Sequence, residues 1–334
     1  MSDAQPALRR GRDDDAAGFI RVVSDCWAEY PGCVTDIDGE APELHRLASH
    51  CAARGGAVWT AEAEGSVVGM ICTWPLADGA WELAKLYVAA AHRGSGVAND
   101  LCGTVERHAR AHGATRMQLW SDTRFERAHR FYEKHSYVRS GPIRALDDKS
   151  KSVEFGYAKP LAGVVVERLD AAGAASAELA LSRILIACVD SGASVSFLPP
   201  LTIERASVFW HRVAGAVARG EKILVAAWLD GALVGTVQVD LAMPENQPHR
   251  GDVAKMLVHP EARRRGIGRL MLQRAEAEAA AAQRTLLVLD TRAGSDAEPL
   301  YRAAGWTEAG RIPFYALSAD RAPHDTVLFF KMIG

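Results

Sequence analysis

The chain of 334 residues is longer than one hydrophobic core usually supports, so two domains are expected. Its residues are 49% hydrophobic and 24% charged, values typical of a globular protein and not of a disordered chain. The net charge of -2 argues against a general polyanion binder, although a local basic patch stays open.

Three further features bear on the compartment. No apolar run is long enough to span a bilayer, and the first residues lack the apolar core of a signal peptide. The six cysteines contain no CxxC pair, which argues against a metal site or a disulfide framework and favours reduced thiols. A cytoplasmic location without membrane contact is therefore expected.

The first half is predicted to alternate strands and helices. The acidic run Asp13–Asp15 marks the cap and first turn of an opening helix. Residues 58–74 indicate a hairpin that turns at Glu64-Gly65, because a Gly-containing pair separates two apolar runs. The remaining elements are a strand at 82–88, a helix that aligns Val97, Leu101 and Val105, a strand at 117–120, a second helix and a closing strand at 152–158.

The second half repeats this series. Residues 164–169 are predicted as its opening strand, and a hairpin around Asp230-Gly231 follows. The remaining elements are a strand at 252–258, a helix beginning near Gly268, a short apolar strand at 285–290, a short helix ending at Gly305 and a closing strand at 325–333.

An internal repeat underlies this similarity, because residues 82–101 reappear as residues 252–271. Three residue pairs are separated by 170 positions: Lys85 and Lys255, Arg93 and Arg263, Gly96 and Gly266. Asp122 and Asp290 are 168 positions apart, and Tyr132 and Tyr301 are 169 apart. Matching order with nearly constant offsets indicates duplication and fusion. We therefore expect an α/β (α+β) chain of two similar domains, residues 1–160 and 161–334, without a flexible linker.

The stretch Arg263-Arg264-Arg265-Gly266-Ile267-Gly268 joins a predicted strand to a predicted helix. Backbone N–H groups at a helix N-terminus carry partial positive charge, and glycines let the backbone approach an anion closely. The third glycine of the dinucleotide fingerprint and the lysine of a Walker loop are both absent. Solvated arginines at a helix start and a nucleic-acid patch are the alternatives. Two copies in the same strand–loop–helix context favour phosphate binding.

This pattern, RxxGxG/A between a strand and a helix with an LYxxxGF-like helix further on, resembles the Gcn5-related N-acetyltransferases (GNAT). The second half also resembles the tabtoxin-resistance type within that family. The resemblance implies two tandem GNAT folds, each a mixed, mostly antiparallel sheet flanked by helices, and acetyl-CoA as cosubstrate, with no metal. It implies cosubstrate contacts from Met256, Leu257, Val258, Arg263, Arg264, Arg265, Gly266, Ile267 and Gly268 in the second half. In the first half the corresponding residues are Leu86, Tyr87, Val88, Arg93, Gly94, Ser95, Gly96, Val97 and Ala98.

Acetylation of an amine requires a general base, because an alkylammonium has a pKa of ~10.4 and only the neutral amine attacks. Asp252 opens the strand that would carry acetyl-CoA, and Glu82 occupies the same place in the first half. The resemblance implies catalytic roles for Asp252, Asp290 and Tyr301. Tyr132 is the corresponding tyrosine of the first half, and either phenol would donate a hydrogen bond to the departing thiolate.

Each of these residues also has a structural interpretation. Asp290 could cap a turn, Asp252 could be a solvated strand end, and Tyr301 could be helix core. The first half departs from the family pattern at Ser95, at Ala98 and at residues 135–137. Activity in both halves therefore stays open beside a first half that only binds CoA or only shapes the second.

The acceptor is the least determined element of the sequence. A small-molecule amine is expected, beside a loop that contains Ser194, Ser196 and Phe197. Beta-lactam-like amino acids, other small amines, aminoglycosides and protein amino groups all stay open as acceptors. The protein is expected to be a monomer or homodimer that does not bind nucleic acid.

Overall fold

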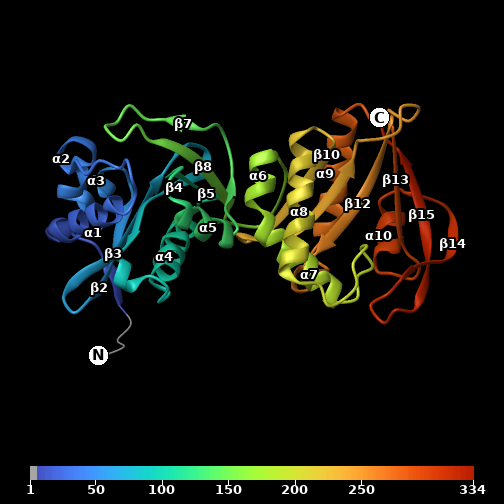
Figure 1. The fold of residues 1–334 in the computed structure, drawn as a ribbon, viewed down its shortest axis with the longest axis horizontal. Coiled ribbons are helices and arrows are strands. Elements are labelled where there is room, and N and C mark those ends of the chain that lie inside the picture. The colour runs from blue at the N-terminus through green and yellow to red at the C-terminus, as the bar shows by residue number, and fades with distance from the viewer. Residues whose placement is uncertain (1–5) are drawn as a thin grey trace. The chain divides into compact units, whose positions relative to one another are not determined.

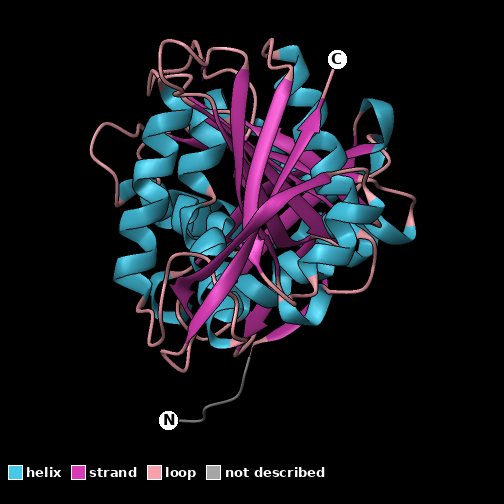
Figure 2. Ribbon diagram, turned by 90° about the vertical axis from the view of Figure 1, so that its right-hand side faces the viewer, coloured by secondary structure: helices cyan, strands magenta, loops and turns pink. Residues whose placement is uncertain are grey.

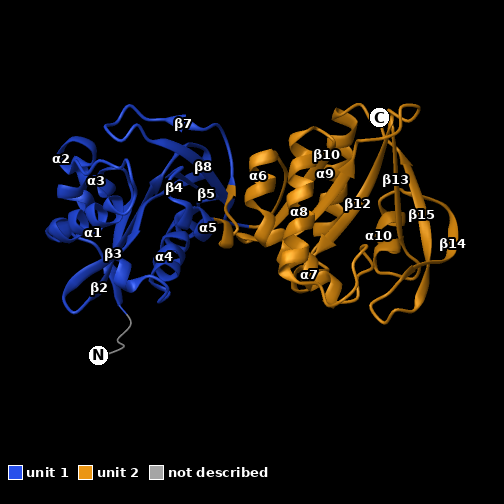
Figure 3. Cartoon of the chain, viewed as in Figure 1, with its two compact units in different colours: residues 1–132, 139–162 blue, residues 133–138, 163–334 orange. Residues whose placement is uncertain are grey.

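The computed structural model describes residues 6–334, and the chain divides into two units (Figure 3). Unit 1 comprises the residues up to Tyr132 together with Arg139–Ala162, and unit 2 comprises Glu133–Val138 together with Gly163–Gly334. Sequence patterning does not anticipate that Glu133–Val138 belongs with unit 2. This segment belongs with unit 2 because Ser136 accepts hydrogen bonds from two of its residues, from Trp228 Nε1 at 3.1 Å and from the Leu233 backbone N–H at 3.2 Å.

Unit 1 contains a mixed sheet with the strand order β1-β2-β3-β4-β5-β8-β6, and β7 pairs with β8. The β4–β5 pairing is parallel, whereas β1–β2, β2–β3, β3–β4 and β5–β8 are antiparallel. Its strands are β1 (Ala7–Arg10), β2 (Ala57–Ala63), β3 (Ser66–Pro75), β4 (Ala80–Val88), β5 (Arg116–Asp122), β6 (Val138–Arg139), β7 (Arg144–Ala145) and β8 (Val153–Pro160). Its α-helices are α1 (Ala16–Ala28), α2 (Ile37–Glu40), α3 (Leu47–Ala53), α4 (Val97–Ala111) and α5 (Glu126–Lys134).

Unit 2 contains a sheet with the order β14-β15-β13-β12-β11-β10-β9, in which β12 and β13 form the parallel pair. Its strands are β9 (Val164–Leu169), β10 (Lys222–Leu229), β11 (Ala232–Asp240), β12 (Arg250–Val258), β13 (Leu286–Arg292), β14 (Thr307–Leu317) and β15 (Pro323–Met332). Its α-helices are α6 (Ala171–Ser176), α7 (Glu178–Asp190), α8 (Ile203–Ala218), α9 (Ile267–Ala281) and α10 (Ala297–Ala303). Figure 1 shows these elements in chain order by colour.

Strand β10 explains how unit 2 buries its sheet. Ile223, Val225 and Ala227 pack in the core that α9 and α10 cover. Leu224, Ala226 and Trp228 alternate with them and pack in the core beneath α6, α7 and α8. A strand covered on both faces is apolar without interruption, as the sequence from Ile223 to Leu229 is. In Figure 2 helices accordingly flank the strands.

Both predicted hairpins are confirmed. Glu64 and Gly65 have φ values of 49° and 72°, and Asp230 and Gly231 have 49° and 90°. Positive φ at both central residues is the geometry of a type I′ turn, whose twist matches that of the flanking strands.

A β-bulge interrupts the central strand of each unit at equivalent lysines. In β12, Lys255 and Met256 together oppose Val237 of β11, and Lys255 has φ 50°. In β4, Lys85 has φ 52° at the same kind of register shift. The parallel pairing with the next strand covers only Arg250–Asp252 in unit 2 and Ala80–Glu82 in unit 1. The bulge therefore opens the sheet along one edge of the central strand.

The predicted fold class is confirmed, with two mixed sheets flanked by helices. The helix expected from Gly268 begins one residue earlier, at Ile267. The sequence pattern misses β14, because the strand lies at the sheet edge and lacks a clear alternation of polar and apolar residues. Within residues 6–334, no helix has the length and apolar character needed to cross a membrane, and none of the six cysteines is in a disulfide.

Candidate functional site

The central feature of unit 2 is a cleft of about 620 Å³ beside the opened strand. Its walls come from the bulged part of β12, the loop into α9, the end of β13, α10 and the segment after α7. Of the predicted site residues, those that line it are Met256, Leu257, Val258, Arg263, Arg264, Gly266, Ile267, Gly268, Asp290 and Tyr301. Asp252 and Arg265 are not among the lining residues.

The loop before α9 presents backbone N–H groups to this cleft. Gly266 is the N-cap of α9 with φ 78°, a conformation that favours glycine, and a Cβ there would meet open space. Among the described residues, no backbone carbonyl accepts from the N–H groups of Ile267 and Gly268. Such free N–H groups at a helix N-terminus attract an anion. In unit 1, Gly96 caps α4 in the same way with φ 96°.

An arginine that both repeats share holds this loop in the same geometry in the two units. Arg263 Nε donates to the Val258 carbonyl at 3.2 Å, and its Nη2 donates to Ser191 Oγ at 2.8 Å. Arg93 Nε likewise donates to the Val88 carbonyl at 2.9 Å, and its Nη atoms bind Glu29 at 2.6 and 2.7 Å. These bonds brace the loop against the strand and the preceding helix, which leaves the loop amides to face the cleft.

A pair of cysteines accompanies these arginine bonds in the two repeats, and the sequence-based prediction did not include it. Cys26 and Cys188 each donate a thiol hydrogen bond to the strand carbonyl that also binds the arginine, at 3.6 and 3.4 Å. The two cysteines are 162 positions apart, and so are Glu29 and Ser191. A search for repeat pairs upstream of residue 82 could have found the cysteine pair.

Asp290 stands at the end of β13 as an exposed carboxylate on the cleft wall. It accepts a hydrogen bond from Thr326 Oγ1 at 3.3 Å, and within residues 6–334 no cation forms an ion pair with it. An acid in this position can take a proton from a ligand, or bind a ligand cation.

Asp252 lies on β12, directly across from Asp240 of β11. Its Oδ2 forms a 3.4 Å ion pair with Arg250, and its Oδ1 is buried without a hydrogen-bond partner in the described residues. Burial raises the pKa of Asp252; the positive charge of Arg250 opposes this shift, and the negative charge of Asp240 adds to it. A raised pKa suits a group that must take up a proton near neutral pH.

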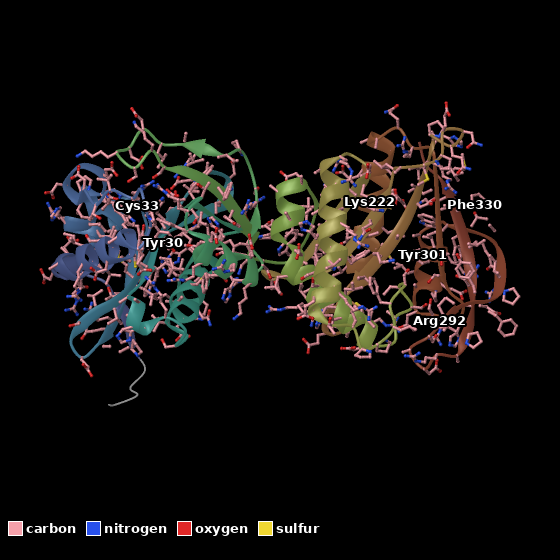
Figure 4. The ribbon with its side chains drawn as sticks, in the orientation of Figure 1. Tyr30, Cys33, Lys222, Arg292, Tyr301 and Phe330 are labelled. Atoms are coloured by element: carbon pink, nitrogen blue, oxygen red, sulfur yellow. The ribbon has the colours of Figure 1, made fainter. Side chains whose placement is uncertain are left out.

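Tyr301 comes from α10, and Figure 4 labels it together with Arg292 of β13, another residue of the cleft wall. The tyrosine is 6% exposed and packs against Trp306 and Phe329 at ring distances of 6.1 and 5.8 Å. Burial raises the pKa of its phenol, and the charge of Asp290 adds to that shift. The phenol therefore stays protonated and can donate a hydrogen bond into the cleft.

The corresponding groups of unit 1 have different surroundings. Glu82 accepts from Trp74 Nε1 at 3.1 Å, and burial raises the pKa of its carboxyl. Tyr132 is 5% exposed, and burial raises the pKa of its phenol too. Asp122 is 4% exposed and bonded by Arg124 Nη2 at 2.5 Å. The carboxylate at the end of β5 is therefore engaged inside the protein.

The bulge lysines also differ between the units, and sequence analysis assigned them no role. Lys85 forms a 2.7 Å ion pair with Glu43. Lys255 lines the cleft of unit 2 and donates to Ser196 Oγ at 3.1 Å, with its Nζ 5.7 Å from the centre of the Phe209 ring. Burial lowers the pKa of Lys255, partly offset by the negative charge of Asp290.

Comparison with known proteins identifies the class of protein. The model of the acetyltransferase (GNAT) family matches residues 19–137 and again residues 193–306. The chain belongs to this family, with two copies of its fold in tandem, and family membership indicates an acyltransferase.

Solved structures of similar fold each span about half of the chain. An N-acetyltransferase from Staphylococcus aureus Mu50 is 17% identical, with a TM-score of 0.45, over 52% of this chain and 100% of that one. The protein yncA from Salmonella typhimurium, solved with acetyl-CoA, is 15% identical, with a TM-score of 0.44, over 52% of this chain and 95% of that one. A ribosomal-protein-alanine N-acetyltransferase from Brucella melitensis is 21% identical, with a TM-score of 0.43, over 51% and 99%.

Proposed function

We propose that the protein is an acetyl-CoA-dependent N-acetyltransferase and that unit 2 acetylates the amine of a small molecule. One observation carries the proposal: the free amides of the α9 loop, the opened edge of β12, Asp290 and Tyr301 all face one cleft. Phosphate binding and acyl-transfer chemistry thus have their groups within reach of one another. The resemblance of this unit to the tabtoxin-resistance type is part of the proposal.

Two parts of the cleft wall support binding of acetyl-CoA. The N–H groups of Ile267 and Gly268 would bind the diphosphate, with Arg264 and Arg269 as nearby cations. The backbone of Met256–Val258, beyond the last parallel pair with β13, would hydrogen-bond the pantetheine amides as a neighbouring strand does. Arg263 would act indirectly, by holding the loop in place.

Acetyl transfer needs a proton acceptor, a donor to the thioester carbonyl and a donor to the departing thiolate. Asp252 or Asp290 would take the proton that the acceptor ammonium must lose, directly or through water. A backbone N–H on the open edge of β12 would donate to the thioester carbonyl as its oxygen gains negative charge. The amine nitrogen then bonds to the acetyl carbon, the carbon–sulfur bond breaks, and the thiolate leaves. Tyr301 would stabilise that thiolate by a hydrogen bond, since a phenol with a pKa of ~10 is a weaker acid than a thiol at ~8.5.

Unit 1 supports a second candidate role. Its loop repeats the cap glycine and the arginine brace, which favours binding of CoA. Its strand-end acid is held by Arg124, which favours a module that binds CoA or shapes the protein without catalysis. Two active units and one active unit are therefore the alternatives. The small-molecule acceptor, the monomeric or homodimeric state and the cytoplasmic location remain predictions.

Matched loop variants test this proposal. In Gly266→Glu, a side chain is forced onto a left-handed backbone and a negative charge is placed where the diphosphate would bind. Acetyl-CoA affinity of unit 2 should fall at least about 100-fold. Gly96→Glu makes the same change in unit 1. Calorimetric titration with acetyl-CoA, together with amine-dependent thiol release, measures both variants.

The outcomes separate the alternatives. If Gly266→Glu loses turnover and Gly96→Glu does not, one unit is active. If each variant loses part of the turnover, both units are active. Unchanged affinity and turnover in Gly266→Glu would contradict the assignment of the cleft.

A further inference from the structure

Lys255 differs from the other inward-facing lysines of the protein. Lys85, Lys159, Lys222 and Lys331 each form an ion pair with a carboxylate. Lys255 is half-buried, and within residues 6–334 no carboxylate lies within 4 Å of its Nζ. A partly buried ammonium without an ion pair is costly, because the more distant charge of Asp290 offsets its desolvation only in part. The cleft therefore holds a cation that an anionic ligand would stabilise.

Asp290 provides the opposite charge in the same cleft. It is exposed on the wall and has no ion-pair partner among the described residues. Asp290 and Lys255 line the same cleft, and the negative charge of Asp290 opposes the lowering of the Lys255 pKa by burial. A ligand that carries both an ammonium and a carboxylate is complementary to this pair, whereas a simple amine leaves Lys255 unpaired and a polyamine adds like charge to it.

The position of Lys255 favours the acceptor over acetyl-CoA as its anionic partner. Its Nζ contacts Ser196, in the segment between α7 and α8, and lies over Phe209 of α8. The phosphate-binding amides are at the N-terminus of α9, and α9 packs in the core of the opposite sheet face. Phe209 packs against the core beneath α7 and α8. Lys255 thus lies on the sheet face that α7 and α8 cover, whereas the loop that would bind the diphosphate leads into a helix on the other face.

We propose that the acceptor of unit 2 is a small amino acid, whose carboxylate binds Lys255 and Ser196 while its ammonium faces Asp290. This inference rests on the proposed N-acetyltransferase function and specifies its substrate class. Lys255 is then a specificity-determining residue. Unit 1 lacks this selectivity, because Glu43 already neutralises Lys85.

Paired acceptors test the inference. The twenty common amino acids, ornithine and 2,4-diaminobutyrate are each compared with the amine that lacks the α-carboxylate, such as lysine with cadaverine. The wild-type protein should prefer the carboxylate member by about 10- to 100-fold in kcat/KM, the range of a charge-assisted hydrogen bond. Lys255→Met should bring the ratio close to one, mainly through KM, and Lys255→Arg should retain it. Lys85→Met is the matched control and should leave the ratio unchanged.

Two further measurements keep the result interpretable. Thermal unfolding and acetyl-CoA titration establish that Lys255→Met folds and binds its cosubstrate. Lys255→Glu should reverse the preference in favour of diamines. Equal use of both members by the wild type, or a ratio that survives in Lys255→Met, overturns the inference and leaves the acetyltransferase proposal intact. Absence of transfer to every amine, with acetyl-CoA bound, overturns both.

Discussion

The ends of β5 and β13 carry the same three residues, Asp-Thr-Arg, in two different arrangements. In unit 1, Arg124 folds back onto Asp122 and also donates to Ser152 Oγ at 3.1 Å. In unit 2, Asp290 is exposed and Arg292 forms no ion pair with it. The loop that would bind phosphate is alike in both units, down to its cap glycine and its arginine brace. The two repeats therefore share the arrangement of this loop and differ in the surroundings of the strand-end acid.

The sharpest way to break this comparison is to neutralise the exposed acid. Asp290→Asn should lower kcat/KM for amine acetylation by about 10²- to 10⁴-fold, because a carboxylate that receives or orients a proton is lost. Steady-state thiol release measures the effect. Asp122→Asn is the matched change and should leave turnover by unit 2 unaltered. Equal losses in both variants would contradict the division of roles.

Asp122 should instead matter for stability. Burial acts to raise the pKa of Asp122, but the bonds from Arg124 together outweigh it and lower the pKa of this carboxyl. Removing this charge should reduce the free energy of unfolding at pH 7 by about 1.5–3 kcal/mol, the range for a hydrogen bond to a charged group. Because the folded-state pKa is depressed, the stabilisation is present above the unfolded value of ~3.9 and is lost as the pH falls through the folded value.

Urea unfolding of wild type and Asp122→Asn at pH 7 and at decreasing pH measures this difference. The gap should close on acidification. A gap that is constant with pH would show that the carboxylate charge is not its source.

The smallest of these effects concerns the two tyrosines. Tyr301→Phe should reduce kcat about 10-fold with little change in KM, because only the departing thiolate loses its hydrogen bond. Tyr132→Phe should not reduce transfer by unit 2. Pre-steady-state and steady-state rates with one amine acceptor measure both. An unchanged kcat in Tyr301→Phe would contradict the role of the hydroxyl and leave only the ring packing against Trp306 and Phe329.

The sequence allowed prediction of the repeat, the hairpins and the glycine-capped loop, because each has a local signature. Gly96 and Gly266 show their conformation through residue type alone. The state of the two acids could not be predicted, since Asp-Thr-Arg occurs in both halves. What separates them is Ser152, thirty positions beyond Asp122 in the chain and beside Arg124 only in the fold. The role of the Arg93 and Arg263 brace was hidden for the same reason: its helix partners, Glu29 and Ser191, differ in type.

The bulge at Lys255 changes how β12 alternates its side chains. A strand normally sends every second residue to the same face. With one additional residue, Val253 and Val258 pack on the same core although they are five positions apart. Removal of a single residue here would shift the register of β12, so that each side chain after the bulge would face the opposite side of the sheet. The length of the strand is thus as much a part of the site as its composition.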